Sequence, residues 1–149
     1  VPEILANMIY GPSYVSLEYA LSRYGLIPEG VHTVTSVTSE RNRSFKTPVG
    51  LFTYTYLRQE YYPHGITWNA VADGRGYLIA TPEKALADRV YREKGITSRS
   101  AMKELLFDNM RIDPDQLRTL DRAGMGRILS RYSEAHMKTL SSVIGELHE

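Results

Sequence analysis

The chain has 149 residues, of which 18 are Lys or Arg and 17 are Asp or Glu, and it contains no Cys. Its length indicates one domain, and its 42% apolar and 23% charged residues are typical of a globular protein with a buried core. A net charge of +1 removes the bulk electrostatic argument for a nucleic-acid binder but leaves room for a local basic patch. The lack of Cys excludes disulfides, thiolate zinc sites, iron–sulfur clusters and a Cys nucleophile.

Three features bear on where the protein works. No apolar run approaches the roughly 20 residues that a transmembrane helix needs, and the first residues carry no basic segment of the kind that opens a secretion signal. The lack of Cys agrees with a reducing compartment, so we expect a cytoplasmic protein. The chain begins at Val1 instead of Met, which favours a piece of a longer protein.

The first 30 residues predict two helices. Residues 3–10 form a short candidate that a Gly-Pro pair interrupts. A clearer helix is expected over residues 14–24, where apolar residues recur at i, i+3, i+4 and i+7. Ser13 can cap its first turn, and Gly25 can take the left-handed conformation that ends a helix.

Four segments predict strands. Residues 31–38 and 51–57 are rich in β-branched and aromatic residues, and neither face of the second segment is strongly polar, which favours an inner strand covered on both sides. Residues 66–72 and 77–80 flank Asp73-Gly74-Arg75-Gly76, and Asp-Gly is a strong hairpin signal.

The remainder of the chain predicts helices. Thr81 and the Pro-Glu pair after it form a good start for a helix over residues 82–94. A second helix is expected over 98–110, a third after an Asp cap at position 113, and a last one as a continuous helix over 125–147.

Together these elements predict an α+β fold: a small, mostly antiparallel sheet of about four strands, preceded by a helix and followed by a C-terminal helical layer. No repeat or linker divides the chain. We therefore expect a single domain over 1–149, with a sheet-containing part at about 10–94 and a helical part at about 95–149.

The residue types that catalysis and metal binding need are scattered. The four His residues do not share a helical face, and no cofactor or metal site is expected from them. His136 falls on an apolar helical stripe, which favours a packed His with a satisfied ring over a ligand. No nucleophile elbow, P-loop or dinucleotide-binding motif is present.

Two enzyme classes can be compared with the acidic residues. A metal-dependent nuclease would need a carboxylate followed one strand later by Asp/Glu-x-Lys, but Asp73 is followed by Glu83 and Lys84 at a helix start. A polymerase-β-type nucleotidyltransferase would need Gly-Ser and then Asp-x-Asp on a strand, but the one such pair, at 113–115, is predicted as a helix cap. We therefore expect no enzyme.

One turn concentrates positive charge. Arg41, Arg43 and Lys46 lie in the predicted loop 39–48 against a single acid, Glu40. Arg residues at alternating positions of a hairpin can project to one side and fork onto phosphates or carboxylates. These three residues are the candidate nucleic-acid or partner contacts, and a solvated hairpin tip is the alternative.

A second basic set, between positions 89 and 103, is interleaved with acids. Asp88 and Arg92 stand at i, i+4 spacing, which predicts an ion pair on the helix surface. This surface is therefore expected to neutralise itself.

Two stretches, residues 10–57 and 73–91, resemble the antitoxin component of bacterial AbiE-type (type IV) toxin–antitoxin systems, the AbiEi-like family of transcriptional regulators. The shared pattern has a Tyr-Val-Ser, Ala-Leu, Gly-Leu helix, then a strand with an Arg-rich turn, a short sheet, and a Thr-Pro-Glu-Lys-Ala-Leu-x-Asp helix start. In this sequence those residues are Tyr14-Val15-Ser16, Ala20-Leu21, Gly25-Leu26, Arg41 to Arg43 and Thr81 to Asp88. The resemblance covers about 80 of the 149 residues and leaves the C-terminal helices unmatched.

The resemblance implies a bacterial cytosolic protein, encoded beside a nucleotidyltransferase-like toxin that it counteracts. Members usually bind operator DNA through an N-terminal winged helix and repress their own operon. That winged helix has no counterpart in this sequence, so the family's main DNA-reading element is expected to lie outside this chain. Direct contact with the toxin and self-association stay open.

Two other functions stay open at this point. One is a DNA-binding transcriptional regulator without a toxin partner, and the other, which the acidic residues favour less, is a cryptic metal-dependent nuclease. A purely structural helical interaction module built on the C-terminal helices is a further possibility.

Overall fold

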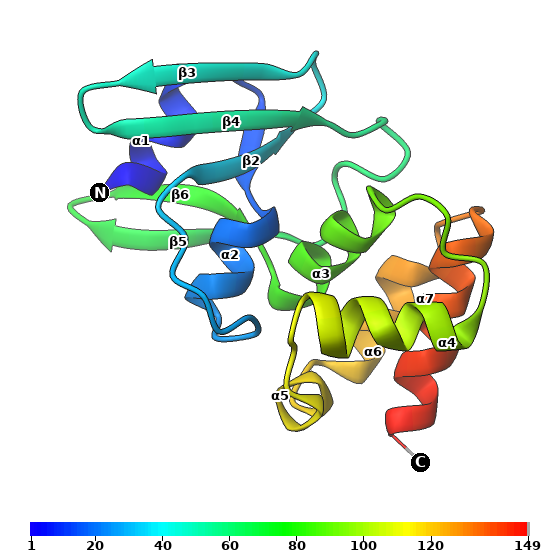
Figure 1. Ribbon diagram of the computed structural model, residues 1–149. Helices are drawn as coiled ribbons and strands as arrows, with labels where there is room; N and C mark the ends of the chain where they lie inside the picture. The colour runs from blue at the N-terminus through cyan, green and yellow to red at the C-terminus, as the bar shows by residue number, and fades with distance from the viewer. Residues whose placement is uncertain (149) are drawn as a thin grey trace.

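The computed structural model describes residues 1–148, which form an α+β fold around one mixed sheet (Figure 1). The sheet has six strands in the order β3-β4-β2-β1-β6-β5. The strands are β1 (Ser13–Val15), β2 (Val34–Thr38), β3 (Arg43–Thr47), β4 (Gly50–Tyr56), β5 (Ile66–Ala72) and β6 (Arg75–Ala80). The helices are α1 (Pro2–Ile9), α2 (Leu17–Arg23), α3 (Pro82–Tyr91), α4 (Arg99–Lys103) with its π-helical continuation η1 (Glu104–Asn109), α5 (Pro114–Arg118), α6 (Arg122–Leu129) and α7 (Ala135–Leu147).

The predicted sheet of about four mostly antiparallel strands is wrong in size and in direction. Two strands were missed, β1 and β3, and two neighbouring pairs are parallel: β1 with β6, and β2 with β4. The β2–β4 pair is parallel because the chain leaves β2, forms β3 at the edge of the sheet, and returns as β4 between them. A hairpin pattern read along the sequence cannot show that insertion.

Strand β1 occupies the place where a helix was predicted to begin. Ser13, Tyr14 and Val15 are all buried, since they lie between β2 and β6 in the middle of the sheet. The helix starts later, with Ser16 at the N-cap of α2. Ser13 therefore does not cap the helix, and its hydroxyl donates to the carbonyl of Tyr10 at 2.7 Å.

The two faces of the sheet carry different helices. Tyr54 on β4 donates its hydroxyl to the carbonyl of Ala6 in α1 at 2.5 Å. Thr35 on β2 pairs in register with Thr53, so its side chain lies on the opposite face, where it accepts a bond from the amide of Tyr19 in α2 at 3.0 Å. The sheet is thus positioned between α1 and α2 (Figure 1).

Strand β4 is an inner strand, as predicted, but it is not covered on both sides. Phe52 and Tyr54 are buried, whereas Leu51 is exposed and Thr53 is only half-buried. The pattern of apolar and Thr residues conceals this difference, because Thr suits a strand whether or not a layer covers it.

The β5–β6 hairpin agrees with its predicted turn. Asp73 and Gly74 both have positive φ, 54° and 74°. This is the backbone that a two-residue type I′ turn requires, and it explains why Asp-Gly stands between the two strands.

The C-terminal part is a layer of helices that packs on α3. The helix predicted over 98–110 changes from α to π geometry after Lys103, and the helix predicted over 125–147 is interrupted between Leu129 and Ala135. Both α6 and α7 bury one face against α3. The apolar stripe therefore continues across the break and gives no sign of it.

Within residues 1–148, no helix is long and apolar enough to cross a membrane.

Candidate functional site

The two sequence stretches that carry the AbiEi-like pattern meet at one buried carboxylate, Asp88 in α3. Its Oδ2 accepts hydrogen bonds from the Tyr14 hydroxyl at 2.8 Å and from the Ser16 hydroxyl at 2.7 Å. The Nζ of Lys84 lies 3.5 Å from Oδ1. Tyr14 and Ser16 stand more than 70 positions away in the sequence. The polar residues of the pattern therefore join β1 and the start of α2 to α3.

The local structure of α3 places these groups. Thr81 caps the helix by accepting a bond from the amide of Lys84 at 3.2 Å, and Pro82 occupies the first helical position. Lys84 and Asp88 then lie one turn apart on the same face of the helix. This face points into the core, so both residues are at most 2% exposed.

Burial dominates the electrostatics of this group, which we call the Asp88 cluster (Tyr14, Ser16, Lys84 and Asp88). Burial raises the pKa of the Asp88 carboxyl, while Lys84 and the two hydroxyl donors oppose that rise. Burial likewise lowers the pKa of the Lys84 amine, against the attraction of Asp88. The Tyr14 pKa is raised well above its usual value, first by burial and then by the Asp88 charge.

The Asp88 cluster supports the fold rather than meeting a ligand. Lys84 also donates to the carbonyl of Tyr61, so its charge is held by two protein groups. The ion pair predicted between Asp88 and Arg92 on the helix surface is wrong, because Asp88 points inward to Lys84. Sequence reasoning missed the cluster, although two charged residues at i, i+4 among Ala85, Leu86 and Ala87 are a sign of a buried pair.

The predicted contact residues lie at the far edge of the sheet, at β3. Arg43 and Lys46 belong to β3 itself, and Arg41 belongs to the turn before it. All three are exposed. Arg43 shares a face with Phe45, while Lys46 alternates to the opposite face. The structure therefore places Arg43 and Lys46 on opposite faces of β3, and Arg41 in the segment that leads into the strand.

We call residues 39–56, which carry Arg41, Arg43 and Lys46, the basic hairpin. Aromatic residues pack against the part of it that carries Arg41 and Arg43. The guanidinium of Arg43 lies over the rings of Tyr10 and Phe45, at 5.3 and 4.9 Å from their centroids. The Tyr10 hydroxyl donates to the carbonyl of Arg41 at 3.2 Å. Within residues 1–148, none of the three basic side chains makes an ion pair. Their charges are thus available to an anionic partner.

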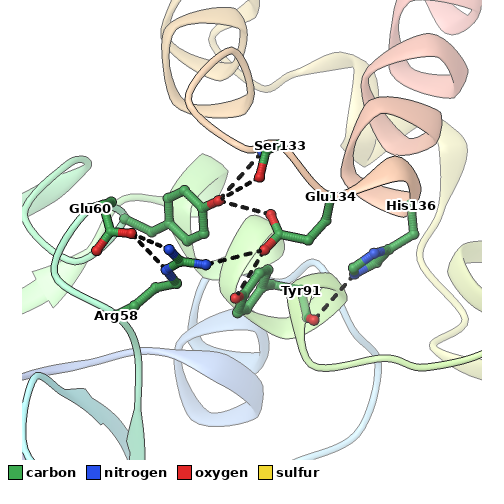
Figure 2. A network of polar contacts seen from close by, with 7 residues as sticks. Arg58, Glu60, Tyr91, Ser133, Glu134 and His136 are labelled. Carbon is green, nitrogen blue, oxygen red and sulfur yellow. Dashed lines mark hydrogen bonds and ion pairs between the residues drawn. The ribbon is translucent and has the colours of Figure 1, made fainter.

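A second polar network joins the loop after β4 to the C-terminal helices (Figure 2). Glu134, at the N-cap of α7, accepts from the Tyr61 hydroxyl at 2.9 Å and from the Tyr91 hydroxyl at 3.3 Å. Arg58 lies 3.9 Å from the same carboxylate. Burial alone would raise the Glu134 pKa, but the bond from Tyr61, the backbone, Tyr91 and Arg58 together lower it.

His136 belongs to this network as a packed residue. Its ring stacks on Tyr91 with centroids 6.2 Å apart, and its Nε2 lies 3.2 Å from the Tyr91 carbonyl. The ring is half-buried and has a polar partner, as its place on the apolar stripe predicts. Among the residues that the structure describes, no three His, Asp or Glu side chains gather as metal ligands would.

The residues considered for a nuclease do not converge. Asp73 is in the turn before β6, while Glu83 and Lys84 follow the other end of that six-residue strand. Six strand residues span about 20 Å, which separates Asp73 from Glu83 and Lys84.

The Asp-x-Asp pair considered for a nucleotidyltransferase is at a helix start. Asp113 caps α5 by accepting a hydrogen bond from the amide of Asp115 at 2.9 Å, as predicted.

Comparison with known proteins adds no relative. No family model matches the chain, and neither a curated protein nor a solved structure does so.

Proposed function

We propose that this chain is a non-catalytic antitoxin domain of a type IV toxin–antitoxin system, which counteracts a nucleotidyltransferase-like toxin in the bacterial cytoplasm. The observation that carries the proposal is the meeting of Tyr14 and Ser16 with Asp88. The two AbiEi-like stretches form one structural unit through the polar residues that the resemblance rests on. This supports the resemblance as a property of the fold rather than of two separate motifs.

The chemistry of the described residues supports a role in contact rather than in catalysis. Burial shifts the pKa values of three groups that could act as an acid or a base, namely Asp88, Lys84 and Tyr14. All three are enclosed in the core, where a substrate cannot reach them. The basic hairpin presents three exposed cations without ion pairs in the part of the chain that the structure describes, and Arg43 among them is held over the rings of Tyr10 and Phe45. An acidic toxin surface or a nucleic-acid phosphate suits that arrangement.

The basic hairpin is proposed as an accessory contact in both activities of such an antitoxin. Operator binding and repression would rest mainly on a winged helix outside this chain. Arg41 and Arg43, at the start of β3, would add a phosphate or carboxylate contact, and Lys46 would reach a partner from the other face of β3.

Coexpression tests the proposal. The nucleotidyltransferase-like protein encoded beside this gene should arrest growth of a bacterial host, and coexpression of this chain should restore growth. A neighbour that is no such protein, or an arrest that the folded chain does not relieve, would overturn the antitoxin assignment. Salt-dependent operator binding in the absence of any toxin neighbour would instead favour the DNA-binding regulator, and metal-dependent cleavage by the purified chain would favour the nuclease.

A further inference from the structure

A cleft of about 350 Å³ is lined by residues that lie outside the basic hairpin. It lies between the loop that precedes β5, the start of α3, and α6. Small-molecule sites begin at about 300 Å³, so the cleft is large enough for a small ligand. The polar residues that line it are His64, Thr81, Glu83, Asp121, Arg127 and Arg131.

The loop wall of the cleft is fixed by close packing. Gly65 has a φ of +88°, and a Cβ at this position would lie 2.7 Å from the Cβ of Lys84 and 3.0 Å from Ile128. The backbone of the loop therefore lies directly on α3 and α6, which only Gly permits. The amide of Thr81 donates to the carbonyl of Gly65 at 2.8 Å. His64 directly precedes Gly65 in the chain and is therefore held at the edge of the cleft.

The acidic groups in the cleft have partners within the protein. Glu83 accepts a hydrogen bond from the amide of Asp121 at 2.9 Å. The carboxylate of Asp121 lies 4.0 Å from the guanidinium of Arg127. Arg131 makes no ion pair within residues 1–148, so it is the cation of the cleft without a carboxylate partner.

Burial and two cations act on the His64 ring. Its pKa is lowered from the ordinary 6.5, first by burial and then by the charges of Arg131 and Lys84. Glu83, Asp121 and Arg127 also line the cleft, and the His64 pKa stays lowered in their presence. At neutral pH the imidazole is therefore uncharged, and it can still donate one N–H to an anion.

We infer that this cleft binds the phosphate group of a small molecule, with Arg131 pairing with the anion and His64 donating a hydrogen bond to it. The guanidinium fork of Arg fits phosphate oxygens in a bidentate way. Inorganic phosphate and a nucleoside monophosphate share this chemistry. They differ in whether a nucleoside fills the part of the cleft that the phosphate group leaves empty. The inference is independent of the antitoxin proposal, since none of its residues belongs to the basic hairpin.

An NMR titration of the His64 ring tests the inference. Inorganic phosphate and AMP are added separately at constant ionic strength, with chloride as the reference. Bound phosphate should raise the His64 pKa by roughly half a unit to one unit, because an anion favours the imidazolium. Saturation by AMP at a concentration at least tenfold lower than by phosphate would identify a nucleotide site, and equal saturation would identify a site for the phosphate group alone.

Two variants make the titration decisive. Arg131→Gln should abolish the response to both anions and should itself raise the His64 pKa in chloride, because it removes a neighbouring cation. Arg75→Gln, which removes one exposed charge on β6, should leave the response unchanged. A His64 pKa that neither anion moves, or a response that Arg131→Gln retains, would overturn the inference.

Discussion

The Asp88 cluster and the basic hairpin both concentrate charge, but burial gives them different roles. In the Asp88 cluster the charges are paired inside the protein and closed to solvent: Oδ2 of Asp88 accepts two hydroxyl hydrogen bonds, while Oδ1 accepts no hydrogen bond from the described residues and faces only the Lys84 ammonium at 3.5 Å. In the basic hairpin the three cations face solvent, and one of them, Arg43, lies over two aromatic rings. The comparison teaches that Tyr14, Ser16 and Asp88, on which the resemblance rests, hold the fold together. Contact with a partner is then expected from exposed residues outside that set.

The largest effect is expected from Asp88→Ala. The change leaves Lys84 charged and unpaired in the core and removes the acceptor of Tyr14 and Ser16. Removing one partner of a buried ion pair costs about 3–5 kcal/mol. Urea denaturation at pH 7 measures the loss of unfolding free energy. A loss below about 1 kcal/mol would show that the cluster does not support the fold. The double change Lys84→Met and Asp88→Leu, which removes both charges, should recover much of the stability.

A smaller effect is expected from Tyr14→Phe. The ring stays in place, but the carboxylate loses one of its hydroxyl donors. A hydrogen bond to a charged group contributes about 1.5–3 kcal/mol. The same denaturation experiment applies, and Tyr62→Phe is a matched control, because the Tyr62 ring packs edge-on against Tyr14 while its hydroxyl makes no hydrogen bond to the cluster. Equal losses in the two variants would show that the hydrogen bond from Tyr14 to Asp88 is not the source of the effect.

Glu134→Gln should have a milder effect that depends on pH. The folded-state pKa of Glu134 is lowered from about 4.5, so its contribution is present above that value and is lost as the pH falls through the folded pKa. We expect the variant to be about 1 kcal/mol less stable at pH 7. The difference should shrink as the pH falls below 4.5. Unfolding curves recorded from pH 7 to pH 3 measure it, and a pH-independent difference would contradict the lowered pKa.

The smallest effect on stability is expected from the basic hairpin. Reversing Arg41, Arg43 and Lys46 to Glu together changes exposed side chains only, so the unfolding free energy should shift by about 0.5 kcal/mol at most for each position. Arg43 should account for most of any loss, because a cation over a ring contributes about 0.5–1 kcal/mol. Thermal unfolding of the triple and single variants measures these values. A collapse of the fold would remove the distinction between the two regions.

Local signals in the sequence predicted part of this structure. The Asp-Gly turn of the β5–β6 hairpin, the Thr81 cap of α3 and the Asp113 cap of α5 depend on neighbouring residues, and each is present. Strand β1 was mistaken for the beginning of a helix, because its three residues become a strand only through β2 and β6. Strand β3 was hidden in a segment whose charges resemble a loop.

The sites divide in the same way. The exposure of Arg41, Arg43 and Lys46 follows from their charge, whereas their division between two faces depends on where β3 begins. The Asp88 cluster requires contacts across more than 70 positions, and one sequence carries no signal of those. The cleft at His64 likewise depends on the close packing of Gly65 against α3 and α6, which only the assembled fold shows.

Growth rescue by the hairpin variant tests the central claim most directly. This chain carrying Arg41→Glu, Arg43→Glu and Lys46→Glu is coexpressed with the nucleotidyltransferase-like toxin that we propose as its partner. It is compared with a matched reversal of exposed residues elsewhere, Arg75→Glu, Arg122→Glu and Lys138→Glu. We predict that the hairpin variant folds but restores growth less well than the unaltered chain, while the matched variant restores it fully. Full rescue by the folded hairpin variant would contradict the account.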